Sequence, residues 1–228
     1  MSEAVLLDSS LPREGEERSV RKRMTYEEFL AWCDEDTWAE WVDGEVIVFS
    51  PAHRQHQEIA DFLLSVLRLY VEARGLGVVL SAPFQMKMQR GREPDLLFVA
   101  REHLDRLQET YLDGPADLVV EIVSAESRLR DRGEKFAEYE EGGVREYWLL
   151  DPERKRADFY VLDSEGRYQR RPLGAEGVYR SEVVQGFWLR GEWLWQQPLP
   201  SPLRVVAEVA GVDPVLLEAF EQALRGPR

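Results

Sequence analysis

The chain has 228 residues, of which 44% are hydrophobic and 11% aromatic, so it is long and apolar enough to form a sizeable core. Disorder of the whole chain does not fit this composition. The net charge of -14 argues against broad nonspecific binding to nucleic acid, because phosphate contact needs local lysine and arginine, but it leaves room for a small basic patch.

Cysteine content and the N-terminal sequence indicate the compartment. A single cysteine, Cys33, excludes an internal disulfide, as a reducing compartment predicts, and its apolar neighbours favour a small core residue. The N-terminus has no basic residues before its short apolar stretch, unlike a secretory signal. No apolar run approaches the roughly 18 residues that a membrane span needs. We expect a cytoplasmic protein that does not enter a membrane.

The chain divides into three expected parts. Residues 1–23 are charged and lack periodicity, which predicts a mobile tail. Residues 24–196 carry the periodic segments of a main domain. Residues 197–228 begin with a Pro-rich connector and end in a helix, for which Asp213 fits the N-cap and Pro214 the first helical position.

The first half of the main domain contains helices and strands in alternation. Thr25 and Glu28 form a capping-box pattern that starts a short helix. Asp43-Gly44 lies between two apolar-aromatic stretches and predicts a hairpin. Apolar residues at helical spacing predict a long amphipathic helix over residues 54–74.

Extended segments follow this helix, around residues 78–80 and 84–88. Glu93-Pro94 then introduces an apolar strand over residues 95–100. The sequence DLVVEIV, residues 117–123, is an almost continuous apolar run, which is typical of a central strand covered on both faces.

The second half continues the mixed pattern. Asp131 and Glu134 resemble a second capping box, which starts a helix that ends at Gly142-Gly143. A strand is expected over residues 146–151, and antiparallel strands over residues 157–196, including the final run FWLRGEWLW. The order of elements predicts a mixed α/β fold.

Glu121 stands inside the predicted central strand, where an ionised carboxylate would be largely desolvated. Such burial costs several kcal/mol unless the charge is paired or binds a metal. Asp95 follows Pro94 directly and precedes the next apolar strand, so the two carboxylates can lie on neighbouring strands. The alternatives are a structural salt bridge from Glu121 to an arginine and a turn role for Asp95.

Lys135 and Tyr139 share one face of the predicted helix after the Glu121 strand. Two carboxylates can hold Mg²⁺ through oxygen ligands, and a nearby ammonium can orient water or stabilise charge on phosphorus. Metal-assisted hydrolysis of a phosphodiester needs this set of groups. The alternative for Lys135 is a surface ion pair with Asp131.

Two long motifs, EPDLLFVA and DLVVEIVSAESRLRDRGEKFAEYEEGGVREYWLLDP, resemble the Uma family of restriction endonucleases, within the PD-(D/E)xK nuclease superfamily. The upstream hairpin and long helix are also similar, so the resemblance spans roughly residues 25–194. It implies a restriction-endonuclease-like core, a mixed β-sheet flanked by helices, with an antiparallel C-terminal extension.

The resemblance implies a metal-dependent endonuclease with Asp95 and Glu121 as ligands of Mg²⁺, or of Mn²⁺ in its place, and with DNA as its substrate. Val123 stands where the superfamily pattern has its lysine, and the family supplies that lysine from the following helix, here Lys135. Ala125 replaces a proline common in the family, from which we expect a slightly different turn and unchanged chemistry.

Further residues are secondary candidates. His56 continues the apolar stripe of its helix, so we expect its ring to face inward, either as a satisfied buried histidine or in the catalytic site. Glu40 precedes the hairpin turn. Arg128 and Arg130, with Arg132, lie between the Glu121 strand and the Lys135 helix, and they form either a solvated face or a phosphate contact.

Two other classes of function also fit the sequence. The acidic composition also fits a catalytically inactive nuclease-fold binding module. The C-terminal helix and the FWLRGEWLW strand also fit an assembly module, in which they make the contact of a homodimer.

Overall fold

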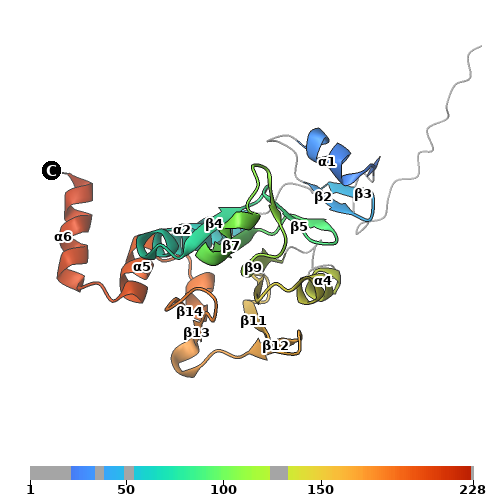
Figure 1. Ribbon diagram of the computed structural model, residues 1–228. Coiled ribbons are helices and arrows are strands. Elements are labelled where there is room, and N and C mark those ends of the chain that lie inside the picture. Colours follow the sequence, from blue (N-terminus) through green and yellow to red (C-terminus); the bar gives the residue numbers. More distant parts are fainter. Residues whose placement is uncertain (1–21, 34–38, 49–53, 124–132, 227–228) are drawn as a thin grey trace, which may run out of the picture.

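The computed structural model describes residues 22–33, 39–48, 54–123 and 133–226. A six-stranded mixed sheet forms its centre (Figure 1). Its strands lie in the order β12 (Tyr168–Arg171), β11 (Arg156–Leu162), β10 (Glu146–Asp151), β9 (Leu118–Ile122), β7 (Leu96–Ala100) and β4 (Gly77–Ser81). β9 and β10 are parallel, whereas every other neighbouring pair is antiparallel. The predicted mixed α/β fold is confirmed.

β9 is the expected central strand, and all five of its residues are buried. Its alternate side chains enter two separate cores, because successive residues of a strand point to opposite faces. Val120 packs in the core under α2 (Arg54–Arg74), whereas Val119 packs in the core under α4 (Glu134–Gly142). α4 is also the crossover that joins the parallel strands β9 and β10.

A second six-stranded sheet lies beside the α4 side of the first. Its strands lie in the order β1 (Lys22–Arg23), β3 (Glu45–Val48), β2 (Ala39–Val42), β6 (Gly91–Arg92), β5 (Gln85–Lys87) and β8 (Tyr111–Asp113). The predicted hairpin joins β2 to β3, where Asp43 and Gly44 both have positive φ angles, as a tight hairpin turn requires. Lys22 and Arg23, expected in the tail, form β1 instead.

The short helix α1 (Tyr26–Trp32) packs on the second sheet. Its predicted capping box is present, since the Thr25 hydroxyl accepts from the Glu28 amide and the Glu28 carboxylate accepts from the Thr25 amide. Phe29 is buried, and Cys33 lies half-buried at the edge of the same cluster.

The C-terminal third differs from the expectation in two places. β13 (Val178–Arg180) and β14 (Trp188–Arg190) are antiparallel strands, but Gly191–Trp195 forms the 3₁₀ helix η3 where a strand was expected. Trp193 and Leu194 are consecutive and both buried, which a strand with one covered face cannot achieve. Two further 3₁₀ turns, η1 (Arg101–Arg106) and η2 (Ala175–Gly177), connect strands.

The predicted connector also contains a helix. α5 (Pro202–Ala210) begins with proline at its first turn, where the missing amide is tolerated, and it packs on α2 through Val205 and Val209. α6 (Pro214–Arg225) follows as predicted, with the Asp213 side chain accepting from the Val215 amide. Across the described residues, the structure contains no helix with the length and apolar character of a membrane span.

Candidate active site

Asp95, in a bend directly before β7, lies beside Glu121 of β9. β7 and β9 are antiparallel, and their pairing begins at Leu96 opposite Val120, so the residue before Leu96 comes close to the residue after Val120 on the α4 face. The Asp95 Oδ2 atom accepts the Ile122 amide at 2.6 Å, which fixes this carboxylate beside the Glu121 strand. The two predicted carboxylates are therefore brought together.

Lys135 reaches Glu121 from the first turn of α4. Its Nζ atom lies 3.0 Å from each carboxylate oxygen, and both side chains are almost fully buried. The crossover from β9 explains the placement, because the helix that follows a parallel strand starts above the strand's carboxyl end. Among the described residues, the cation that contacts Glu121 is a lysine and not the arginine considered from sequence.

Tyr139 lies one turn further along α4 and donates from Oη to Oε1 of Glu121 at 2.6 Å. Burial, and then the Glu121 carboxylate, hold the pKa of Tyr139 well above its usual value. The hydroxyl therefore stays protonated and acts as a donor. Lys135 and Tyr139 share one helical face, as their spacing predicted.

Glu40 joins the cluster from β2, where it is fully buried. Its Oε1 atom lies 3.0 Å from Nζ of Lys135, and its Oε2 atom accepts from Nη1 of Arg92 at 2.7 Å. Lys135 is therefore held between two carboxylates, one from each sheet. This secondary candidate lies in the same cluster as Glu121.

Arg92 is the buried cation that joins the second sheet to α4. It is fully buried on β6, and its Nε and Nη2 atoms donate to the two oxygens of Glu138 at 2.7 and 2.8 Å. Burial acts to lower the pKa of Arg92, but Glu40 and Glu138 outweigh burial and raise it above its usual value. The guanidinium stays charged and braces Glu40.

Glu93 is a further carboxylate of this junction. Burial, and then the nearby Glu40 carboxylate, raise the pKa of Glu93 to about 8. Its Oε1 atom accepts from Nε2 of Gln85. The carboxyl therefore keeps its proton at neutral pH, mainly because it is buried.

His56 approaches Asp95 from the first turn of α2. Its ring is mostly buried, as expected, and its Nε2 atom lies 3.2 Å from Oδ1 of Asp95. One Asp95 oxygen thus faces a backbone amide and the other a histidine. His56 lies in the candidate site, whereas Arg128, Arg130 and Arg132 lie outside the described residues.

The donor set suits a hard divalent cation. Glu121 on β9 and Asp95 directly before β7 offer carboxylate oxygens, the ligand type that Mg²⁺ prefers, on neighbouring segments of the chain. Within the described ranges, no group of three or more His, Cys, Asp or Glu side chains is arranged as a metal cage. Waters and substrate oxygens would complete the shell, as is usual for Mg²⁺.

Sequence reasoning missed Arg92 and Glu93. Both stand directly before Pro94-Asp95, in the run that leads from β6 into β7. Charged residues at the entry to an apolar strand were the signal, but the same pattern is typical of a solvated turn. Only the approach of β2 to this run shows that the two side chains are buried.

Comparison with known proteins places the chain in a family. The family model described as "Uma2: Putative restriction endonuclease" matches residues 26–192, well over half of the chain. The chain belongs to this family. The resemblance predicted from the sequence is thereby confirmed.

The fold also has a counterpart among solved structures. A crystal structure described as a "putative nuclease" from Anabaena variabilis matches with a TM-score of 0.62 and 16% identity. The match covers 75% of this chain and 97% of that one. At this identity the match bears on the fold alone, and it confirms the fold class. No curated protein sequence matches the chain significantly.

Proposed function

We propose that this Uma2-family protein is a divalent-metal-dependent endonuclease that hydrolyses phosphodiester bonds in DNA. One observation carries the proposal: Asp95, directly before β7, lies beside the Glu121 strand, where it accepts the Ile122 amide at 2.6 Å, and the Lys135 ammonium lies 3.0 Å from Glu121. We place the activity in the cytoplasm, since a single cysteine is what a reducing compartment predicts.

Asp95 and Glu121 would hold the cation, with Mg²⁺ the expected ion and Mn²⁺ an alternative. When bound, such an ion neutralises charge on the phosphate and lowers the pKa of a nearby water. The Ile122 amide and His56 fix the two oxygens of Asp95, which makes His56 a positioning residue for that ligand. Tyr139 plays the same part for Glu121.

Lys135 would supply the catalytic cation. In the described arrangement its ammonium is shared between Glu121 and Glu40, one on each sheet. An ammonium held at this point can orient the attacking water and stabilise charge that develops on phosphorus. Arg92 keeps Glu40 in place, so it supports Lys135 through that carboxylate.

DNA is the proposed substrate because the family is described in terms of restriction endonucleases. With a net charge of -14, attraction of a polyanion has to come from local basic groups. Arg128 and Arg130 stay candidates for phosphate contact on sequence grounds, from their place between Glu121 and Lys135.

A catalytically inactive binding module is the second candidate, and one observation favours it. Glu121 is already satisfied by Lys135 and Tyr139, as a purely structural ion cluster would be. The two functions differ in metal affinity. Calorimetric titration with Mn²⁺ gives heat for the enzyme and none for a module whose ligands serve only the fold.

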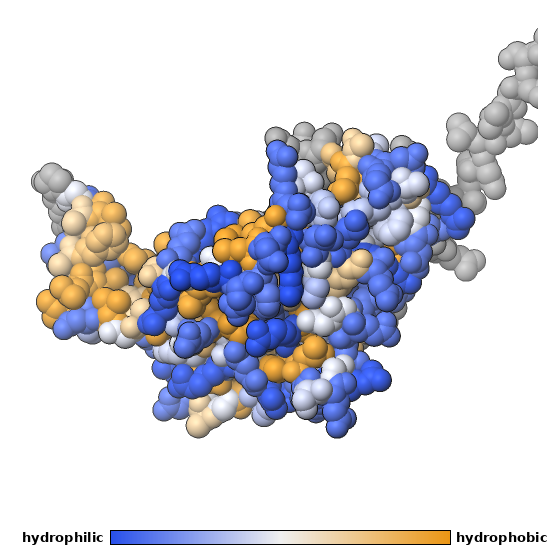
Figure 2. Space-filling model, viewed as in Figure 1, coloured by the Kyte–Doolittle hydropathy of each residue, from blue (hydrophilic) through white to orange (hydrophobic). Residues whose placement is uncertain are grey.

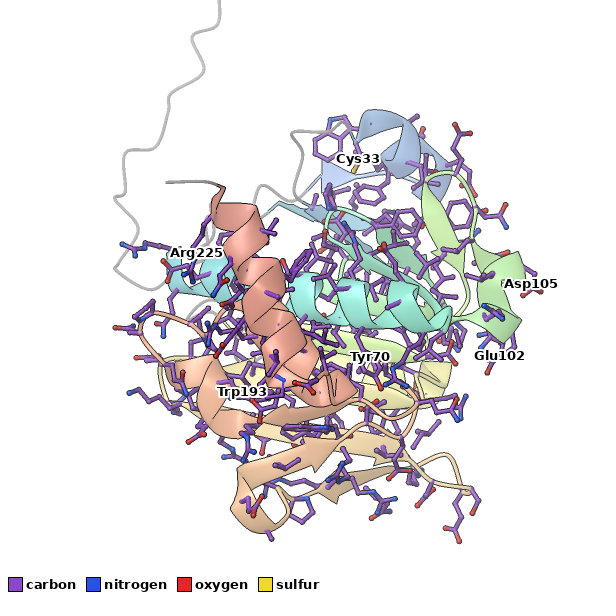
Figure 3. All side chains as sticks on the ribbon, turned by 90° about the vertical axis from the view of Figure 1, so that its left-hand side faces the viewer. Cys33, Tyr70, Glu102, Asp105, Trp193 and Arg225 are labelled. Atoms are coloured by element: carbon purple, nitrogen blue, oxygen red, sulfur yellow. The ribbon has the colours of Figure 1, made fainter. Side chains whose placement is uncertain are left out.

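A cleavage assay tests the proposal. Supercoiled plasmid DNA is incubated with the purified chain and Mg²⁺ or Mn²⁺, and with EDTA as the blank. We expect metal-dependent nicking that falls at least about 100-fold in Asp95→Asn, Glu121→Gln and Lys135→Met. Asp105→Asn, on the exposed turn η1 (Figure 3), is the matched control and should cut normally. Activity that persists in both Glu121→Gln and Lys135→Met would refute the assignment.

A further inference from the structure

The C-terminal helix α6 carries an apolar face that the described protein does not cover. In the part of the chain that the structure describes, no residue of α6 is buried. The relative exposures of its large apolar side chains are 72% for Val215, 66% for Leu216, 51% for Phe220 and 66% for Leu224. Soluble monomers seldom expose a contiguous set of this kind, which more often marks an interaction site.

The arrangement of α6 leaves this face open. The helix projects from the end of the molecule beyond α5 (Figure 1), and hydrophobic residues gather over it (Figure 2). Only Leu217 and Glu221 are half-buried, and Glu221 accepts from Arg204 of α5 at 2.5 Å. One flank of α6 is thus held to α5. The exposed flank is the α6 apolar face, which we define as Val215, Leu216, Ala219, Phe220, Ala223 and Leu224.

α6 also lies outside the domain that the family shares. The family model ends at residue 192, and the solved nuclease-like structure is covered over 97% of its length by only 75% of this chain. The candidate active site is complete without α6, because all its described side chains come from residues before 140. Any function of the helix therefore lies outside that site.

We propose that the α6 apolar face binds the α6 apolar face of a second copy of this chain, with the two helices antiparallel about a two-fold axis. An axis between positions 219 and 220 sets the two largest side chains at the centre of one copy against alanines of the other, with a valine–leucine pair at each end. Phe220 then meets Ala219, Leu216 meets Ala223, and Val215 meets Leu224. Parallel pairing would instead oppose Phe220 to Phe220 and Leu216 to Leu216, which packs two large groups into one space.

The charges at the ends of α6 favour the same pairing. Asp213 caps the amino end, and Arg225 stands in the last turn (Figure 3), so antiparallel helices bring the acid of one copy to the base of the other. The helix dipoles are also opposed in this arrangement. The only other charged residues of α6 are Glu218 and Glu221. Glu221 accepts from Arg204 and lies 3.7 Å from Arg225 of its own helix, so the long Arg225 side chain is shared between Glu221 and the partner's acid in the dimer.

The surface area that the two helices can bury sets the expected affinity of the dimer. A helix of 12 residues is about 18 Å long, so two such helices bury less than the roughly 800 Å² per partner of a standard interface. We therefore expect a dimer that dissociates on dilution, not an obligate one. The full chain has a mass of 26.5 kDa, so a dimer is readily resolved from a monomer.

Sedimentation velocity over a dilution series of the full chain tests the proposal. We expect a monomer–dimer equilibrium that Leu216→Glu weakens at least about thirty-fold, because the variant places a charge in the centre of the contact. Leu69→Glu is the control, since Leu69 is an exposed leucine on α2 with 46% relative exposure. It should leave the equilibrium unchanged, and circular dichroism should show both variants folded.

Disulfide cross-linking in a Cys33→Ser background tests the direction of the helices. Mixing Val215→Cys with Leu224→Cys should give a cross-linked dimer, whereas Val215→Cys alone should not. A chain that stays monomeric at all concentrations would overturn the proposal. Equal weakening by Leu69→Glu, or cross-linking of Val215→Cys with itself, would overturn it as well.

Discussion

Lys135 Nζ lies 3.0 Å from both oxygens of Glu121, although the two residues are 14 positions apart in the sequence. A parallel crossover explains this contact, because β9 ends beside Glu121 and α4 starts above that end. Lys135 also contacts Glu40 of the second sheet. The ammonium thus joins three elements at one point, and its removal should affect both stability and chemistry.

Replacing Lys135 by methionine should destabilise the fold. The variant leaves Glu121 and Glu40 without their shared cation, and the loss of one partner from a buried ion pair costs about 3–5 kcal/mol. Urea denaturation measures the free energy of unfolding. Lys155→Met, at an exposed turn, is the control and should change that free energy by less than about 0.5 kcal/mol. Equal effects of the two variants would contradict the buried role of Lys135.

Replacing Arg92 by lysine tests whether the guanidinium is needed to hold Glu40 in place. The guanidinium donates to Glu40 and Glu138 together, whereas a single ammonium cannot reproduce this fork. We expect the free energy of unfolding to fall by about 2–3 kcal/mol. Arg54→Lys, in an exposed pair with Glu58, should cost no more than about 0.5 kcal/mol. If Arg92→Lys left the free energy of unfolding unchanged, the simultaneous contact with Glu40 and Glu138 would not be needed for stability.

The raised pKa of Glu93 predicts a pH dependence of stability. The pKa of Glu93 is about 8 in the folded state and 4.5 in the unstructured chain. Between these two pH values Glu93 is therefore protonated in the folded state and ionised in the unfolded state. Stability therefore falls as the pH rises from about 4.5 to about 8, by up to about 1.4 kcal/mol per pH unit. The penalty is then constant above pH 8.

Glu93→Gln should remove this dependence, since glutamine cannot ionise. In metal-free buffer, the variant should gain on the order of 3 kcal/mol over the wild type between pH 5 and pH 8. Glu109→Gln, at an exposed position, should follow the wild type. Parallel curves for Glu93→Gln and the wild type would show that Glu93 ionises normally in the folded protein.

Local patterns predicted the elements of the site well. The run around Glu121 is apolar on both faces and so had to be a covered strand, and the Asp43-Gly44 turn fixed the hairpin that carries Glu40. Lys135 and Tyr139 shared a helical face by spacing alone. These patterns did not predict the approach of the second sheet. That tertiary contact is what buries Arg92 and Glu93.

Tertiary contact also explains why the sequence did not predict α5 and η3 in the C-terminal third. Prolines before residue 203 suggested a connector, but Pro202 occupies the first turn of α5, where proline is tolerated, and Val205 and Val209 pack on α2. The helix depends on that tertiary contact. The same holds for η3, whose adjacent Trp193 and Leu194 are both buried.

The proposed activity requires that Asp95 and Glu121 hold one divalent cation next to Lys135. Anomalous diffraction from crystals soaked in Mn²⁺ reports the position of the ion and its ligands together. We predict one peak with oxygens of both carboxylates at about 2.0–2.3 Å, and its loss in Asp95→Asn crystals. A soaked crystal without a peak between these carboxylates, or a peak that survives Asp95→Asn, would show that Asp95 and Glu121 do not form this metal site.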